Sequence, residues 1–276
     1  LQNASAEQDR GFIWEASAGN NRVYLMGSIH FADSTFYPLR NEIESAFAQS
    51  DTLVVEVDIA ALDPLQMQAM VLQKGTYTDG SSIKDHINDN TYRLLEQYLQ
   101  KRNLPVELFN RYKPGMLVMT LSSMELMQMG LSPAQGIDMH FLSHARGVKP
   151  IVELETLDQQ LDLMMDIAES DQMLHQTLEE FDTYPELMTA MLEIWKKGDT
   201  EGLNELLIQK PLREYPQSKP VFEKMFIQRN LQMTEKITAY LNSGKSHFVV
   251  VGAGHLVGER GIVDLLQRAG FNVRQL

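Results

Sequence analysis

The stretch Val23-Tyr24-Leu25-Met26-Gly27-Ser28-Ile29-His30 decides the fold of this chain. Its apolar first half is typical of a buried strand, and this strand runs directly into a Gly-x-x-His turn. The same pattern returns near the other end of the chain as Phe248-Val249-Val250-Val251-Gly252-Ala253-Gly254-His255. A helix and a further strand are predicted after each turn, as far as Val57 and Leu276. We therefore expect two strand-GxxH-helix-strand pseudo-repeats, one at each end of the chain.

These pseudo-repeats predict an α/β fold with a central mixed, largely parallel sheet flanked by helices. Crossovers between parallel strands are right-handed, and ligands bind at the carboxyl ends of such strands. Long, mostly helical insertions are expected over 62–145 and 156–240, with a strand at 147–154 between them. Because no low-complexity tract or flexible linker divides the chain, we expect a single domain over residues 1–276, with residues 1–9 as a disordered lead-in.

The first pseudo-repeat is predicted in more detail. Phe12 to Ala16 and Arg22 to Met26 are expected to form a hairpin around a turn at residues 18–21. A helix is expected to open at Pro38 and to run through Gln49, because apolar residues recur there with a helical period. The β-branched and apolar run from Thr52 to Val57 predicts a buried strand.

Composition limits the classes of function. The 276 residues are 43% hydrophobic and 22% charged, which is enough to bury a sizeable core, and no apolar run approaches the roughly 20 residues that span a membrane. A formal net charge of -13 with scattered basic residues argues against nucleic acid as a partner. The chain has no cysteine, which excludes disulfides, thiolate metal sites and cysteine nucleophiles. Together with the polar start at Leu1, this leads us to expect an exported, periplasmic or secreted protein.

Two histidines and a strand-end acid form the candidate site. His30 and His255 each follow a strand, and Glu56 ends another, so all three are expected at one edge of the sheet. Imidazole nitrogens with a carboxylate suit a divalent ion such as zinc, manganese or cobalt. The alternative interpretation of Glu56 is an ion pair with an arginine such as Arg40 or Arg229. Glu155 is a second strand-end acid, and Glu153 is a weaker candidate because it lies within its strand.

Several other motifs are weaker. His140 and His144 are four residues apart on an expected helix, but the sequence between them lacks the glutamate of a His-Glu-x-x-His motif, so we interpret them as a solvated or partly packed face. The glycines after Val251 resemble a dinucleotide loop, but too little chain follows to complete a nucleotide-binding unit. Ser28 has no Gly-x-Ser-x-Gly elbow around it and is interpreted as a turn serine.

Five segments in order along nearly the whole chain carry a resemblance to a known family. They are Tyr24 to His30, Leu53 to Asp58, Leu154 to Thr156 with Gln160-Leu161, Arg229-Asn230, and Val250 to Leu256. In these segments the chain resembles the TraB/GumN family, which is related to the Tiki Wnt-cleaving metalloproteases and more distantly to the erythromycin esterase/ChaN-like group. The resemblance implies one α/β domain with a metal-dependent hydrolytic centre at His30, Glu56 and His255. It also implies that Glu155, Arg229 and Asn230 line the same pocket and act as catalytic residues.

Two functions that use this site remain open at this point, beside a purely structural interaction protein in which His30 and His255 would lie far apart. The first is a metal-dependent hydrolase of peptide or amide bonds, in which Glu155 accepts a proton from an activated water and Arg229 stabilises an oxyanion or orients a carboxylate. The second is a non-enzymatic binder that captures a peptide, a signalling molecule or a metal-bearing ligand in the same pocket. In either case the partner is a peptide or a small molecule. The amphipathic middle, Leu157 to Trp195, fits a lid, a homo-oligomer contact or plain core packing.

Overall fold

The computed structural model describes residues 11–276, which fall into two compact units. One unit joins the described residues up to Ala60 with Leu131–Glu155 and Met188–Leu276, and the other joins Ala61–Gly130 with Thr156–Leu187. The expected lead-in, residues 1–9, lies outside the described residues. The single domain expected over the whole chain stays a prediction.

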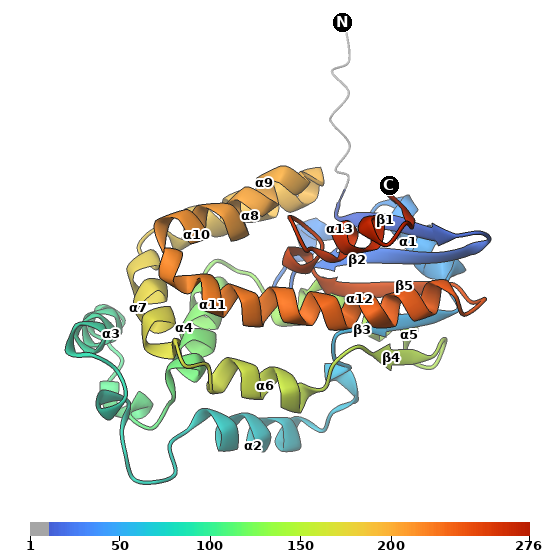
Figure 1. Cartoon of the computed structure of the whole chain (residues 1–276). Helices are drawn as coiled ribbons and strands as arrows, with labels where there is room; N and C mark the ends of the chain where they lie inside the picture. The colour runs from blue at the N-terminus through green and yellow to red at the C-terminus, as the bar shows by residue number, and fades with distance from the viewer. Residues whose placement is uncertain (1–10) are drawn as a thin grey trace, which may run out of the picture. The chain divides into compact units, whose positions relative to one another are not determined.

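One sheet organises the first unit (Figure 1). Its strand order is β4-β3-β5-β2-β1-β6. The strands are β1 (Ile13–Ala18), β2 (Asn21–Ser28), β3 (Thr52–Val55), β4 (Ile151–Glu153), β5 (His247–Gly252) and β6 (Asn272–Gln275). Strand β1 pairs antiparallel with β2 and β6, whereas β4, β3, β5 and β2 run parallel to one another. The predicted α/β class with a mixed, largely parallel sheet is confirmed.

The first pseudo-repeat is confirmed with shifted boundaries. The hairpin is present, with Ile13 opposite Met26. The helix expected from Pro38 is wrong at its start, because α1 is Asn41–Gln49 and Arg40 is its N-cap, with an extended ψ of 147°. Leu39 is buried in the segment that leads into this helix. It is apolar because it packs into the core there, and it does not belong to the first helical turn.

The two pseudo-repeats cross the sheet in opposite directions. The first runs from β2 through α1 to β3, and the second from β5 through α13 (Ile262–Arg268) to β6. Right-handed crossovers in opposite directions put their helices on opposite faces of the sheet. Figure 1 shows α13 in front of the sheet and α1 behind it. The loops that leave the neighbouring strands β2 and β5 therefore diverge, which is the position where α/β sheets bind ligands.

Apolar side chains fix the helices on both faces. On one face, Phe47 of α1, Phe141 of α5 (Ile137–Ala145) and Phe248 of β5 form an aromatic cluster with ring centroids 4.7–5.5 Å apart. On the other face lies α12 (Gln228–Leu241), whose contacts include β1 and β2. Its buried side chains recur every four residues, as the apolar stripe of a surface helix requires: Met233, Ile237 and Leu241.

The remaining helices complete the two units. In the first unit, α9 (Thr200–Asn204), α10 (Lys210–Glu214) and α11 (Lys219–Phe222) are joined by π-helical turns at Glu205–Gln209 and Glu223–Ile227. The helix α8 (Tyr184–Lys197) begins in the second unit and ends in the first. The second unit contains α2 (Pro64–Gly75), α3 (Asp89–Lys101), α4 (Pro114–Gln128), α6 (Leu157–Met165) and α7 (Ser170–Glu180).

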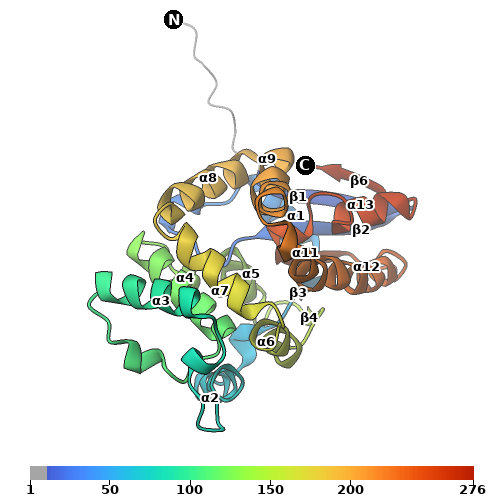
Figure 2. The same ribbon diagram turned by 60° about the vertical axis from the view of Figure 1, so that its left-hand side comes forward.

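The second unit has a core of its own. Helix α7 packs against both α3 and α4 (Figure 2). Leu95 and Leu99 of α3, Leu121 of α4 and Leu174 of α7 are buried in this core. Helix α6 approaches α4 closely, since a Cβ on Gly115 would lie 1.9 Å from the Met164 carbonyl oxygen.

Among residues 11–276, no helix has the length and apolar character needed to cross a membrane.

The aromatic cluster gives a test of the fold. We expect Phe248→Ala to lower the free energy of unfolding by about 3–5 kcal/mol, because it leaves a cavity under a central strand. Val148→Ala is the matched control, since that side chain is 75% exposed and should cost little. Urea unfolding followed by circular dichroism measures both, and equal losses in the two variants would contradict the assigned core.

Candidate functional site

Four of the predicted residues follow four adjacent parallel strands. Glu155 follows β4, Glu56 follows β3, His255 follows β5, and His30 follows β2. Since the strand order is β4-β3-β5-β2, the four side chains come from neighbouring positions along one edge of the sheet. The structure thus brings both Gly-x-x-His turns and both strand-end acids to the same edge.

The two Gly-x-x-His turns touch each other. A Cβ on Gly27 would lie 3.1 Å from the Cα of Ala253 in the second turn and 2.9 Å from the Cβ of Phe12. Only glycine allows the two turns to approach this closely at that point. The carbonyl oxygen of Gly27 accepts a 2.8 Å hydrogen bond from the buried indole N–H of Trp195, which anchors the first turn to this side chain.

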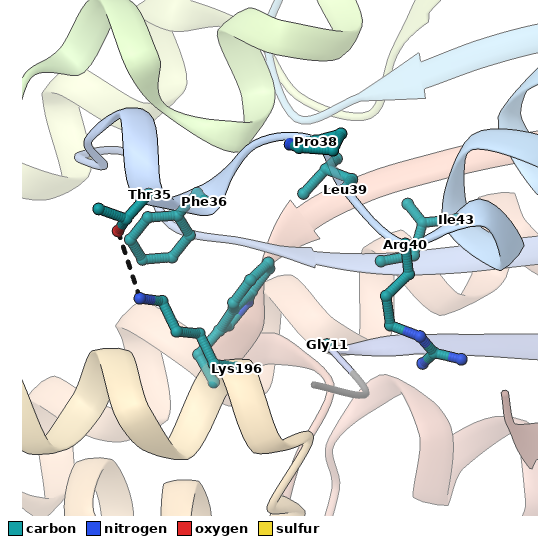
Figure 3. Close-up of a pocket in the computed structure, with 9 residues that line it drawn as sticks. Gly11, Thr35, Phe36, Pro38, Leu39, Arg40, Ile43 and Lys196 are labelled. Atoms are coloured by element: carbon teal, nitrogen blue, oxygen red, sulfur yellow. Dashed lines mark hydrogen bonds between the residues drawn. The ribbon is translucent and has the colours of Figure 1, made fainter. Parts of the chain in front are cut away.

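Trp195 also lines a separate hollow (Figure 3). The hollow is partly open to solvent, and its empty volume, with that open space included, is about 410 Å³. Its lining combines buried apolar side chains such as Phe36 and Ile43 with the cations Arg40 and Lys196. The ammonium group of Lys196 donates to the Thr35 hydroxyl across 3.3 Å. None of the predicted site residues lines this hollow, which is therefore separate from the candidate site.

Arg229 joins the two strand-end acids. From the first turn of α12, its Nη2 lies 2.6 Å from Glu56 Oε2 and 2.6 Å from Glu155 Oε2, and its Nε donates to Glu155 Oε1 across 2.8 Å. All three side chains are at most 15% exposed. The arginine partner of Glu56, left open by the sequence, is therefore Arg229. Arg40 instead pairs with Glu42 at 3.2 Å.

Glu56 also reaches the second turn. Its Oε1 accepts a 2.6 Å hydrogen bond from the Gly252 N–H and lies 4.0 Å from His255 Nε2. Burial by itself would raise the pKa of the Glu56 carboxyl. The interactions with His255 and Arg229 outweigh burial and lower this pKa to about 2, so the group is a carboxylate at neutral pH.

His255 is buried and held through one edge of its ring. Its Nδ1 lies 2.6 Å from Asn230 Oδ1, while the Asn230 amide nitrogen donates to the Arg260 carbonyl oxygen. This second bond assigns the amide orientation, so Nδ1 of His255 carries the proton and Nε2 presents a lone pair on the Glu56 side. Phe226 packs near the ring, with centroids 5.1 Å apart. Burial lowers the pKa of His255 to about 4, which keeps the ring neutral.

His30 is exposed and has a carboxylate partner that the sequence did not reveal. Its side chain is 67% exposed, and its Nδ1 donates to Asp138 Oδ2 across 2.9 Å. The other oxygen of Asp138 accepts a hydrogen bond from the Ser28 hydroxyl. The Asp138 carboxylate raises the pKa of His30 to about 9. In the sequence, Asp138 is an acid in the first turn of a helix, a common position that by itself carries no sign of function.

The other histidines of the described chain stay apart from this site. His140 stacks on Tyr37 and lies 3.2 Å from Glu44, and His144 packs on His140. The remaining rings have local partners: His86 with Tyr77, His175 with Glu179, and His247 with Tyr240. Glu153 accepts a hydrogen bond from the Asp58 N–H instead of joining the Arg229 network.

The donor chemistry of the site suits a divalent metal. Both histidines have Nδ1 held by an oxygen and Nε2 left over, which is the pattern of metal-ligating imidazoles. Two ligand atoms of one tetrahedral zinc ion lie about 3.4 Å apart, somewhat closer than the 4.0 Å between His255 Nε2 and Glu56 Oε1. The side chains therefore stand slightly too far apart for a bound ion. Consistent with this, no group of three or more His, Cys, Asp or Glu side chains within residues 11–276 is arranged to hold a metal ion.

A family model covers almost all of this architecture. The model of the TraB/PrgY/gumN family matches residues 12–275, from β1 to β6. The chain belongs to the TraB/PrgY/gumN family. The match includes every residue of the candidate site, and it agrees with the resemblance seen in the sequence.

Two curated relatives of this TraB/PrgY/gumN chain are similar over different lengths. The protein named "Metalloprotease TIKI2" of Xenopus tropicalis is 20% identical over 319 residues, covering 98% of the chain and 60% of the relative. The protein named "Metalloprotease TIKI homolog" of Amphimedon queenslandica is 30% identical over 81 residues, covering 29% of the chain and 13% of the relative. The chain thus spans less than two thirds of the length of these relatives. No solved structure matches the chain.

The Arg229 network gives a second test. We expect Arg229→Met to lower the free energy of unfolding by about 3–5 kcal/mol, because it leaves two buried carboxylates without their cation. The double variant Arg229→Met, Glu155→Gln should recover part of the loss, since it removes one of those charges. Thermal and urea unfolding measure both, and Arg268→Met, at an exposed ion pair, is the control. A double variant that is less stable than Arg229→Met would contradict this account.

Proposed function

We propose that the protein is a metal-dependent hydrolase that cleaves peptide or amide bonds. The observation that carries the proposal is the pair of imidazoles at one sheet edge, each held at Nδ1 and each with Nε2 left over, beside the carboxylate of Glu56. The similarity to two proteins named metalloproteases supports the reaction class. These two observations are independent, since the first is a geometric arrangement of side chains and the second is a similarity of sequence.

In this proposal His30, His255 and Glu56 would hold the ion, with zinc, manganese and cobalt as candidates. A bound divalent ion would supply a polarising charge and a coordinated water with a pKa near ~7. Asn230 is proposed to position His255 rather than to touch the substrate, because its amide oxygen is taken by Nδ1. The interactions that lower the Glu56 pKa keep this group a carboxylate at neutral pH without the metal, so the ligand is ready to bind.

Glu155 and Arg229 are proposed to act as a pair. Arg229 holds both carboxylate oxygens of Glu155 in place. Glu155 is proposed to take a proton from water and later deliver it to the leaving amine. Arg229 fixes this carboxylate and Glu56 in the same arrangement. Its Nη1 donates to the Met225 carbonyl oxygen at 3.2 Å, so most of its donors serve the protein. Stabilisation of an oxyanion by Arg229 is therefore the smaller part of its proposed role.

An exported location and a role as a secreted or periplasmic peptidase belong to the same proposal. The absence of cysteine fits an oxidising compartment.

Metal analysis and peptide cleavage test the function together. The protein purified without chelator should contain about one equivalent of a transition metal, and it should cleave members of a peptide library. His30→Ala and His255→Ala should lose the metal and at least 100-fold in kcat/KM, because each removes a ligand. His144→Ala, at an exposed histidine outside the site, should keep both properties.

One result would overturn the proposed hydrolase activity, and a second would then identify a binding protein. If wild type, His30→Ala and His255→Ala cleave no peptide with any of the three metals, the proposed reaction is wrong. If the protein then retains a peptide or a metal-bearing ligand through purification and releases it in His255→Ala, the same pocket serves a binding protein instead.

A further inference from the structure

The two histidines of the site are supported very differently. The side chain of His255 is 6% exposed and is enclosed by protein, with Phe226 beside its ring. The side chain of His30 is 67% exposed, and its hydrogen bond to Asp138 is the only one that the described residues give its ring. Packing therefore orients His255, whereas the orientation of His30 depends on a single carboxylate.

Asp138 is itself held rigidly. Its side chain is 15% exposed, and its second oxygen accepts the Ser28 hydroxyl hydrogen. Ser28 is 3% exposed and is the last residue of β2, so the carboxylate is fixed to the strand that carries the first turn. A longer side chain would lose more rotamer freedom when it is held in this position, and that loss would cost more free energy.

The backbone brings Asp138 to this place. The Ile137 N–H donates to the Ile29 carbonyl oxygen across 3.0 Å, which ties the start of α5 to the first Gly-x-x-His turn. A Cβ on Gly136 would lie 2.4 Å from the His30 carbonyl oxygen, so a glycine is needed where α5 meets the turn. A second link, between Ala32 and Ser132, lies just beyond. These backbone contacts join the start of α5 directly to the first turn.

We propose that Asp138 is a positioning residue that fixes the His30 imidazole through Nδ1 and directs Nε2 into the site, and that Ser28 in turn fixes Asp138. An acid in the first helical turn also interacts favourably with the helix dipole. That role alone would not require hydrogen bonds from both His30 and Ser28, one accepted by each carboxylate oxygen. It is this two-sided bonding that assigns Asp138 to the site.

The orientation of His30 can be measured without metal. In the metal-free protein, the Nδ1–H proton of His30 should give a downfield NMR signal that is protected from exchange, identified by its loss in His30→Gln. Asp138→Ala should abolish the signal, and Asp138→Asn should keep a weaker one, because the amide oxygen still accepts a hydrogen bond. Asp264→Asn is the matched control, since Asp264 lies in the first turn of α13 and bonds to Arg260 and Arg268 instead.

Metal affinity is the second measurement, and it alone rests on the proposed function. We expect Asp138→Ala to weaken Co²⁺ binding by about 10- to 100-fold, with a smaller loss for Asp138→Asn and Ser28→Ala. Isothermal titration gives the affinities, and thermal unfolding of each metal-free variant identifies any that fail to fold. Asp264→Asn should bind Co²⁺ as wild type does.

The outcomes separate the two proposals. An unchanged His30 signal in folded Asp138→Ala would overturn the positioning role, whatever the metal does. A wild type that binds no metal while the signal follows Asp138 would overturn the metal-dependent function and leave the positioning role standing. Equal Co²⁺ affinities in wild type and Asp138→Ala would show that His30 needs no such support, which also contradicts the inference.

Discussion

The ion network of Arg229 is the interaction on which the site depends. Adjacent parallel strands deliver Glu56 and Glu155 to the same edge, and two buried carboxylates side by side repel each other. A cation must therefore be supplied from elsewhere in the chain, and α12 supplies it with its second residue. Because the same helix packs Met233, Ile237 and Leu241 into the core, the position of the guanidinium is set by hydrophobic packing as well as by charge.

The direction of the two crossovers explains why the two Gly-x-x-His turns lie side by side. From neighbouring strands, the loop after β2 leads to one face of the sheet and the loop after β5 leads to the other. Such a divergence opens the sheet edge between those two strands, and the two Gly-x-x-His turns stand on either side of it. Gly27 then allows the turns to touch through Ala253. One topological feature thus accounts for the pairing of motifs that lie more than 200 residues apart in the sequence.

Sequence patterns could predict the parts of the site that lie in or next to strands. His30, Glu56, Glu155 and His255 each follow a recognisable apolar run, so the strand order alone brings them together. Asp138 could not be found in this way, because its role comes from α5 docking on a distant turn through Gly136. The same reason left the cationic partner of Glu56 open, since Arg40 and Arg229 are equivalent until the position of α12 is known. The start of α1 was misplaced because buried Leu39 fits a helical period as well as it fits the extended segment that it occupies.

The balance of charge bears on what the site can accept. Glu56, Glu155 and Asp138 provide three carboxylates, and Arg229 provides one cation that is already engaged by two of them. Even with a proton on His30, whose pKa Asp138 raises to about 9, the group keeps one net negative charge, since burial keeps His255 neutral. A site of this sign favours a cation over a phosphate or a free carboxylate. This supports a metal ion as the occupant, and it weakens the idea that Arg229 binds a substrate carboxylate directly: a peptide would approach through its neutral amide bonds.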